Sequence, residues 1–317
     1  MSKTEARTIP KGTPKVKHRR FNISTLQMTL MVLPAILFVI VFKYIPMAGL
    51  FIAFKNVNFT DGIFNSPWVG LANFEYFFGF GDAWYVTRNS VLYSLAFIVT
   101  GVSASVAMAV LLNEITNKKM IKVFQTATFI PYFMSMVVVA YMLSVFFDPT
   151  LGVATSLLGK VGIDLNIYVT PGAWPWVFII TNLWKAVGYN TIIYYAAIIG
   201  IDKSYYEAAE IDGASKWQTV RYITLPLIKP TVIVLVLLAL GKIFHNDFGM
   251  FYFLPQDIGV LYSTTQVLDT FVYKTMRSSM DIGQASAVAL YQSVVGFVLV
   301  IVSNKLARKY DRESALF

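Results

Sequence analysis

The sequence predicts an all-α membrane protein with six transmembrane helices, and three observations lead to that prediction. First, 56% of the 317 residues are hydrophobic and only 14% are charged. A typical soluble domain has about 45–50% apolar and about 25% charged residues, so too few charges remain to cover a water-facing surface. Second, the mean hydropathy is +0.61. Third, at about 20 apolar residues per crossing, the apolar stretches have room for about five or six spanning helices.

Six apolar segments are long enough to cross a membrane. The first is residues 26–42, which can continue past the kink expected at Pro46 to Phe54. The others are residues 91–112, 127–147, 174–201, 225–244 and 282–303. An even number of crossings puts both termini on the same side of the membrane.

The distribution of Lys and Arg predicts which side that is. Eighteen of the 26 lie in the N-terminal tail, the second-to-third loop, the fourth-to-fifth loop and the C-terminal tail. Six lie on the opposite side, and Lys185 and Lys242 lie at helix depth. Cytoplasmic segments carry the excess of positive charge, so both termini are predicted to be cytoplasmic. The expected organisation is a basic tail (1–25), a transmembrane domain (26–306) and a short C-terminal tail (307–317).

Several function classes are excluded by residue usage. The chain has no Cys, which excludes a disulfide scaffold, a thiolate metal site and a Cys nucleophile. Its two histidines, His18 and His245, are isolated in sequence, so we expect neither a His-based metal site nor a catalytic triad. No catalytic residue and no metal ligand is therefore predicted, and the chain is not expected to be an enzyme.

The outer segment from residue 55 to residue 88 is rich in Phe, Trp, Gly and Asn. Two interpretations stay open for it. Aromatic residues gather at membrane interfaces, so the segment can be an interfacial belt. It can equally form a surface that docks another protein or a sugar.

The fourth-to-fifth loop, about residues 202–226, is polar and longer than a simple connection. Glu207 is expected to begin a short helix, because a carboxylate in the first turn suits the helix dipole and two alanines follow it. Gly213 allows a sharp break. A second short helix is expected from Ala214 to Tyr222, with apolar anchors at Trp217, Val220 and Tyr222. Pro226 then fits the first turn of the fifth transmembrane helix.

This loop resembles the EAA signature of the permease subunits of binding-protein-dependent ABC importers. The matching positions are Glu207, Ala208, Ala209, Asp212, Gly213, Ile223, Leu225 and Pro226. The resemblance covers the chain from the second helix to the sixth. It implies the type I importer permease fold, in which the two short helices of the loop couple the pore to an ATPase.

More locally, residues 43–56, 68–74 and 241–252 resemble carbohydrate permeases. Within that group they are most similar to the branch that imports oligosaccharides of complex polysaccharides. Lys242 stands where that branch more often has Arg, which keeps the charge but loses the bidentate fork of the guanidinium.

The resemblance implies a set of partners in a bacterial cytoplasmic (inner) membrane. Two permease subunits, similar but not necessarily identical, form the pore, and an extracytoplasmic solute-binding protein delivers the sugar. Two ATPase subunits bind ATP and Mg²⁺, so no cofactor is expected in this chain. Glu207 is expected to pair with a basic residue of the ATPase. The alternatives are a permease for another delivered solute or a secondary transporter, although secondary transporters usually show two related halves. Whether the sugar is neutral or acidic stays open.

The candidate substrate pathway is on the fourth helix. Lys185 lies about 16 Å from the helix start at 1.5 Å per residue, which is near mid-membrane. Asn182 and Tyr189 share its helical face, and together the three groups can hydrogen-bond sugar hydroxyls, while the ammonium also suits a carboxylate. Lys242 is a further candidate, although snorkelling to the interface suits it better. The alternative for Lys185 is structural, through a carboxylate such as Asp247 or through snorkelling.

Overall fold

The computed structural model describes residues 23–79, 81–162 and 166–310, which form helices joined by turns. Within those ranges there is no β-strand, and a single isolated bridge joins Lys55 to Trp68. The all-α prediction is confirmed. Residues 1–22 and 311–317, which make up most of the two predicted tails, lie outside the described part. The chain divides into two compact units, residues 1–50 and 51–317.

The first unit contains an apolar helix that continues through a proline. Its elements are α1 (Ile23–Val39), the π-helical turn η1 (Ile40–Tyr44) and α2 (Ile45–Met47). Pro46 has no N–H to offer the carbonyl of Phe42, and its ring crowds that carbonyl. The N–H of Ile45 bonds instead to the carbonyl of Ile40, five residues back, and this π turn absorbs the mismatch. As predicted, the apolar stretch passes Pro46, and Leu26–Phe54 is long and apolar enough to span.

The remaining helices and helical turns follow in chain order. They are η2 (Ala48–Phe54), α3 (Gly62–Asn65), α4 (Ala72–Gly79), α5 (Asp82–Asn113), α6 (Lys118–Phe129), η3 (Ile130–Phe133), α7 (Met136–Phe146), α8 (Val153–Lys160), η4 (Pro171–Ala173), α9 (Trp174–Ile199), α10 (Lys203–Ile211), α11 (Lys216–Thr219), η5 (Val220–Thr224), α12 (Leu225–Leu240), α13 (Phe248–Phe253), η6 (Gly259–Leu261), α14 (Tyr262–Thr265), α15 (Leu268–Ser279) and α16 (Ile282–Tyr310).

Among the described residues, four helices are long and apolar enough to cross a membrane, or five if one bent pair counts as a single span. The four are Leu26–Phe54, Asp82–Asn113, Lys216–Leu240 and Ile282–Lys305. The fourth predicted segment, residues 174–201, corresponds to α9, which has 26 residues and a length of about 39 Å. It is not among the four, because Trp, Tyr, Asn and Lys residues interrupt its apolar stretches.

Two predicted spans differ from the structure. The third was expected as one spanning segment over 127–147, but the chain bends by 95° between Lys118–Phe133 and Met136–Phe146. A new helix starts there, because the hydroxyl of Ser135 caps α7 by accepting the N–H of Val138. The second span starts at Asp82 and not at 91, because its polar first turns are helical and pack into the protein.

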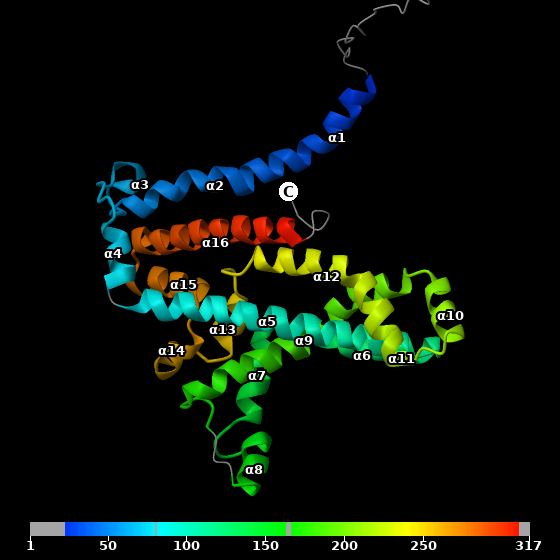
Figure 1. The fold of residues 1–317 in the computed structure, drawn as a ribbon. Helices are drawn as coiled ribbons and strands as arrows, with labels where there is room; N and C mark the ends of the chain where they lie inside the picture. Colours follow the sequence, from blue (N-terminus) through cyan, green and yellow to red (C-terminus); the bar gives the residue numbers. More distant parts are fainter. Residues whose placement is uncertain (1–22, 80, 163–165, 311–317) are drawn as a thin grey trace, which may run out of the picture. The chain divides into compact units, whose positions relative to one another are not determined.

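The second unit is organised along α5. This helix has 32 residues, so it is about 48 Å long. Figure 1 shows α4 and α15 near its beginning and α6, α10 and α11 near its end. Its small residues Ser105 and Ala109 are fully buried, and Ala109 packs with Tyr194 and Ile198 of α9. The two ends of α5 therefore lie on opposite sides of the unit.

The outer segment from residue 55 is folded around a buried lysine. The Lys55 ammonium donates to the carbonyls of Ile63 and Phe64, at 3.3 and 2.6 Å. It also lies near the rings of Phe51 and Trp68. The ammonium thus provides a hydrogen-bond donor for carbonyls at the end of α3. Aromatic side chains around it stay exposed, so the interfacial and docking interpretations of the segment both stay open.

Candidate functional sites at the two ends of α5

At the cytoplasmic end predicted by the charge distribution, α10 begins at a strong cap. The Asp202 carboxylate accepts the N–H of Ser204 at 2.9 Å. This hydrogen bond holds the pKa of Asp202 below its usual value. The prediction that Glu207 begins the helix is wrong, because the cap at Asp202 starts the helix at Lys203 and leaves Glu207 in the second turn.

The sharp break expected at Gly213 is confirmed. Gly213 has a φ of +76°, in the left-handed region that glycine tolerates best. The N–H of Ala214 reaches back to the carbonyl of Ala209 at 2.9 Å, and the N–H of Gly213 to that of Glu210 at 3.1 Å. These two bonds form a Schellman motif, which satisfies the last carbonyls of α10. The break is therefore a well-defined turn.

The second helix of the loop is continuous with the fifth transmembrane helix. Ser215 and Gln218 form a capping box at the start of α11. The π turn η5 then leads into α12, where the N–H of Leu225 bonds to the carbonyl of Val220. Pro226 cannot make the regular bond, and the π turn absorbs that loss as the one before Pro46 does. The expected separate helix over 214–222 is thus wrong.

Two side-chain contacts fix the loop to the spanning helices. The hydroxyls of Tyr206 and Thr224 lie 3.1 Å apart, which joins α10 to η5. The Lys216 ammonium pairs with the Glu114 carboxylate at 2.6 Å, just after α5 ends. Because both groups are exposed, this pair adds little stability, although it links the start of α11 to the end of α5.

The loop exposes large apolar side chains. Ile211 is 86%, Trp217 67% and Tyr222 69% exposed. Of the three expected apolar anchors, Trp217 and Tyr222 are exposed, whereas Val220 is half-buried. Glu207 is also exposed, and it is in no ion pair within the part of the chain that the structure describes. Several large exposed apolar side chains on one short stretch of chain are typical of a surface that another protein covers.

The structure places all eight positions of the EAA signature in this one region. Glu207, Ala208 and Ala209 lie on α10, Asp212 and Gly213 in the turn, Ile223 in η5, and Leu225 and Pro226 at the start of α12. Their coupling role stays a prediction.

The predicted pathway residue Lys185 lies against the bend between η3 and α7. Its ammonium donates to the carbonyl of Tyr132 at 3.1 Å and also to that of Met134. The helix break leaves these carbonyls without their regular partners, so Lys185 satisfies them. Tyr189 stacks on Tyr132, with ring centroids 4.4 Å apart and planes at 8°.

A close helix crossing next to Lys185 requires a glycine. A Cβ on Gly188 would lie 2.0 Å from the carbonyl oxygen of Thr128. Only glycine lets α9 approach α6 at this distance.

The other pathway candidates lie elsewhere. Asn182 lines a separate cavity of about 270 Å³ between α5, α9 and α12. Lys242 is exposed just beyond α12. Asp247, the carboxylate considered as a partner for Lys185, instead caps α13 by accepting the N–H of Met250 at 3.1 Å. The structure thus brings together Lys185 and Tyr189 only, and the pathway role of the four residues stays a prediction.

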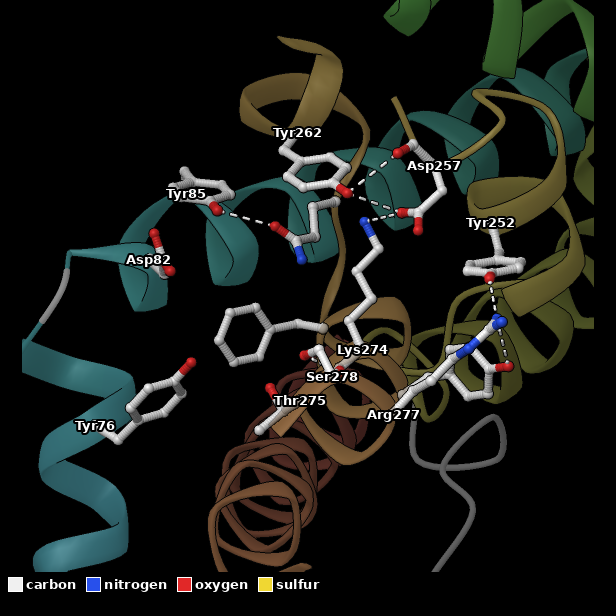
Figure 2. Close-up of a pocket in the computed structure, with 13 residues that line it drawn as sticks. Tyr76, Asp82, Tyr85, Tyr252, Asp257, Tyr262, Lys274, Thr275, Arg277 and Ser278 are labelled. Carbon is white, nitrogen blue, oxygen red and sulfur yellow. Dashed lines mark hydrogen bonds and ion pairs between the residues drawn. The ribbon is translucent and has the colours of Figure 1, made fainter. Parts of the chain in front are cut away.

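At the opposite end of α5 lies a polar cavity of about 590 Å³ that no sequence pattern predicted (Figure 2). Its lining is Tyr76, Asp82, Tyr85, Tyr252, Asp257, Tyr262, Gln266, Phe271, Tyr273, Lys274, Thr275, Arg277 and Ser278. These residues come from two segments that are far apart in the sequence, residues 76–85 and 252–278, and no local pattern joins them. The clustered tyrosines and cations of 252–278 are the signal that could have indicated it. We call this cavity the outer pocket.

One side of the outer pocket holds an internal ion pair. The Lys274 ammonium pairs with Asp257 and lies over the ring of Tyr262. Burial lowers the pKa of Lys274, and Asp257 opposes that shift. The Tyr262 hydroxyl donates to the Asp257 carboxylate at 3.0 Å. Burial, followed by this hydrogen bond, raises the pKa of Tyr262 to about 12. These three groups therefore satisfy one another.

Another side of the outer pocket presents a guanidinium. Nη1 of Arg277 donates to the hydroxyls of Tyr252 and Tyr273, at 2.9 and 3.4 Å. Arg277 is in no ion pair with a carboxylate of the described residues. Asp82 is likewise in no ion pair there, and near it the Tyr85 hydroxyl donates to Gln266 at 2.9 Å. Besides the pair of Lys274 and Asp257, the pocket thus holds Arg277 and Asp82, which are not paired with each other.

Comparisons with known proteins give a consistent result. Residues 101–312 match the family model described as "Binding-protein-dependent transport system inner membrane component". Two similar proteins come from Bacillus subtilis strain 168. Protein LplB is 32% identical, covering 90% of this chain and 89% of that protein. The polygalacturonan/rhamnogalacturonan transport system permease protein YteP is 31% identical, covering 94% of each.

A solved structure has the same fold along nearly the whole chain. It is the crystal structure of a bacterial ABC transporter involved in the import of the acidic polysaccharide alginate. One of its chains aligns with a TM-score of 0.82 at 31% identity, covering 90% of this chain and 96% of that one. A second structure shows a bacterial alginate ABC transporter in complex with an alginate pentasaccharide-bound periplasmic protein, with a TM-score of 0.81, 30% identity and the same coverage. The chain therefore belongs to the family of inner-membrane components of binding-protein-dependent transport systems, as a permease similar to those of sugar-importing ABC transporters.

Proposed function

We propose that this permease forms half of the pore of an ATP-driven oligosaccharide importer and is coupled to an ATPase subunit through α10 and α11. Membership of the transport family makes it a transporter component and not an enzyme. The observation that carries the proposal is the likeness to the alginate transporter chain over 90% of this chain. The printed names of YteP and of the alginate transporter support an oligosaccharide as the substrate.

The geometry of the loop suits a coupling role. A loop that transmits motion must be stiff. The capping groups at Asp202 and Ser215, together with the turn at Gly213, make α10 and α11 stiff. The loop must also be connected to the pore helices. The contacts from Tyr206 and Lys216 connect it to η5, which leads into α12, and to Glu114 just after α5. The exposed Glu207 is then available to a basic residue of the ATPase.

The proposed assembly contains a second permease subunit, two ATPase subunits that bind ATP and Mg²⁺, and an extracytoplasmic binding protein. The binding-protein complex of the alginate transporter supports that last partner. The 18-to-6 distribution of Lys and Arg supports cytoplasmic termini. In that orientation α10 and α11 face the ATPase, and the outer pocket faces the binding protein.

The coupling role is tested with a matched pair of variants. We expect Glu207→Ala to weaken recovery of the ATPase with the tagged permease by at least about 30-fold in apparent affinity. The physical reason is that removing one partner of an interfacial charge pair costs about 2–5 kcal/mol, and about 1.4 kcal/mol is a factor of ten. The measurement is copurification from native membranes, followed by ATP hydrolysis with and without the binding protein.

Glu75→Ala is the control, because Glu75 is also exposed on a short helix but lies at the other end of α5. It should leave recovery and hydrolysis unchanged. Normal ATPase recovery and normal stimulation in Glu207→Ala would contradict the coupling role, provided that both variants insert equally.

A further inference from the structure

We propose that the outer pocket is a substrate subsite that binds a carboxylate-bearing sugar residue in one orientation, with the sugar carboxylate on Arg277 and its hydroxyls toward Asp82. The inference rests on the proposed import function. It adds where the substrate binds and that the substrate carries a negative charge.

The shape and lining of the outer pocket suit a sugar. Its volume of about 590 Å³ falls within the range of small-molecule sites, about 300–1,000 Å³. Five tyrosines line it: Tyr76, Tyr85, Tyr252, Tyr262 and Tyr273. A tyrosine offers both a flat apolar face and a hydroxyl, which matches a sugar ring with its apolar C–H face and its rim of hydroxyls.

Arg277 is arranged to receive a carboxylate. Both phenol contacts use Nη1, so the edge formed by Nε and Nη2 keeps its donors. A guanidinium edge of that kind binds a carboxylate through two parallel hydrogen bonds. Figure 2 shows Tyr252 beside the guanidinium. The phenols therefore hold Arg277 in place without neutralising it.

The other charges of the outer pocket determine the orientation in which the sugar binds. Lys274 is occupied by Asp257, so it offers less attraction to a second carboxylate. Asp82 lines the pocket across from Arg277 in Figure 2. A carboxylate near Asp82 would be repelled, whereas a sugar hydroxyl can donate to it. A uronate residue matches this polarity, and a neutral sugar leaves Arg277 without a charged partner.

The test measures direct binding to the purified complex in nanodiscs, in the absence of the binding protein. The probes are trisaccharides of galacturonate, mannuronate and guluronate, each compared with its own methyl ester, which has nearly the same shape but no charge. Saturation-transfer NMR detects weak ligands. We expect at least one acid to bind at least about tenfold more tightly than its ester, since a charge-assisted hydrogen bond contributes that much.

Variants locate the effect. Arg277→Gln should abolish the preference for the acid, and Arg277→Lys should retain part of it because the charge stays. Tyr252→Phe should weaken the preference, since it removes a phenol that holds the guanidinium. The control is Lys160→Gln, which removes an exposed positive charge from α8 outside the pocket and should leave the preference intact.

Three results would overturn the inference. The first is equal affinity within every acid–ester pair, or binding of none of them. The second is the same loss in Lys160→Gln as in Arg277→Gln, which would indicate general attraction of anions. The third is an acid preference that stays intact in Arg277→Gln while the same variant lowers transport in the presence of the binding protein, which would place Arg277 in a protein interface. In each case an intact, ATP-hydrolysing complex would leave the proposed import function standing.

Discussion

Lys185 shows how a single charged residue is accommodated within a membrane segment. The sequence predicts either a pathway role for Lys185 or a structural one, through a carboxylate such as Asp247 or through snorkelling to the interface. The structure instead gives it the carbonyls of Tyr132 and Met134 at a helix break. A backbone carbonyl is present in every residue, so no sequence pattern identifies acceptors that lie more than fifty residues away. The pairing could therefore not be predicted. Gly213 is the opposite case, because its left-handed conformation was predictable from the residue type alone.

We expect Lys185→Met to lower the thermal stability of the assembled complex. The substitution leaves two carbonyls without a donor, at a cost of about 1–3 kcal/mol for each unsatisfied group. The measurement is the melting temperature of the detergent-solubilised complex, followed by size-exclusion chromatography. Lys242→Met is the matched control, since Lys242 is exposed beyond α12. An unchanged melting temperature with lowered transport would favour the pathway role over the structural one.

At the scale of elements, the loop of residues 202–226 was predictable in outline, but the predicted bounds of its helices are wrong. Two helices around Gly213 were predicted from the residues. The motif predicts a helix start at Glu207, whereas α10 begins earlier because Asp202 is a favourable N-cap. The continuity of α11 with α12 depends on a π turn before Pro226, and a proline in a sequence is ordinarily a reason to end a helix.

The cap at Asp202 can be tested by hydrogen exchange. Asp202→Ala should increase exchange in the first turn of α10, because the N–H of Ser204 loses its acceptor, whereas Asp202→Asn should preserve protection. The pKa of Asp202 is lowered in the folded chain. The charge of Asp202 therefore stabilises the folded chain fully above the ordinary pKa of a carboxyl group. This stabilisation is lost as the pH falls through the lowered pKa of the folded chain. At neutral pH, equal protection in the Ala and Asn variants would contradict the cap's role.

At the scale of the whole molecule, the fold class was predictable and the outer pocket was not. Apolar stretches and the distribution of Lys and Arg are local signals, and they give helices and an orientation. The outer pocket needs α4, α5, α13, α14 and α15 to come together, which is a matter of tertiary packing. α5 connects that pocket to the region of α10 and α11, so one rigid helix of about 48 Å joins the two proposed sites.

The central claim, that this permease belongs to an ATP-driven importer, is tested most directly by transport into proteoliposomes. The purified complex is reconstituted, ATP and Mg²⁺ are trapped inside, and the binding protein loaded with a labelled oligosaccharide is added outside. The account predicts accumulation that requires both internal ATP and the binding protein. Accumulation without ATP that follows an imposed proton or sodium gradient would contradict it and would indicate a secondary transporter.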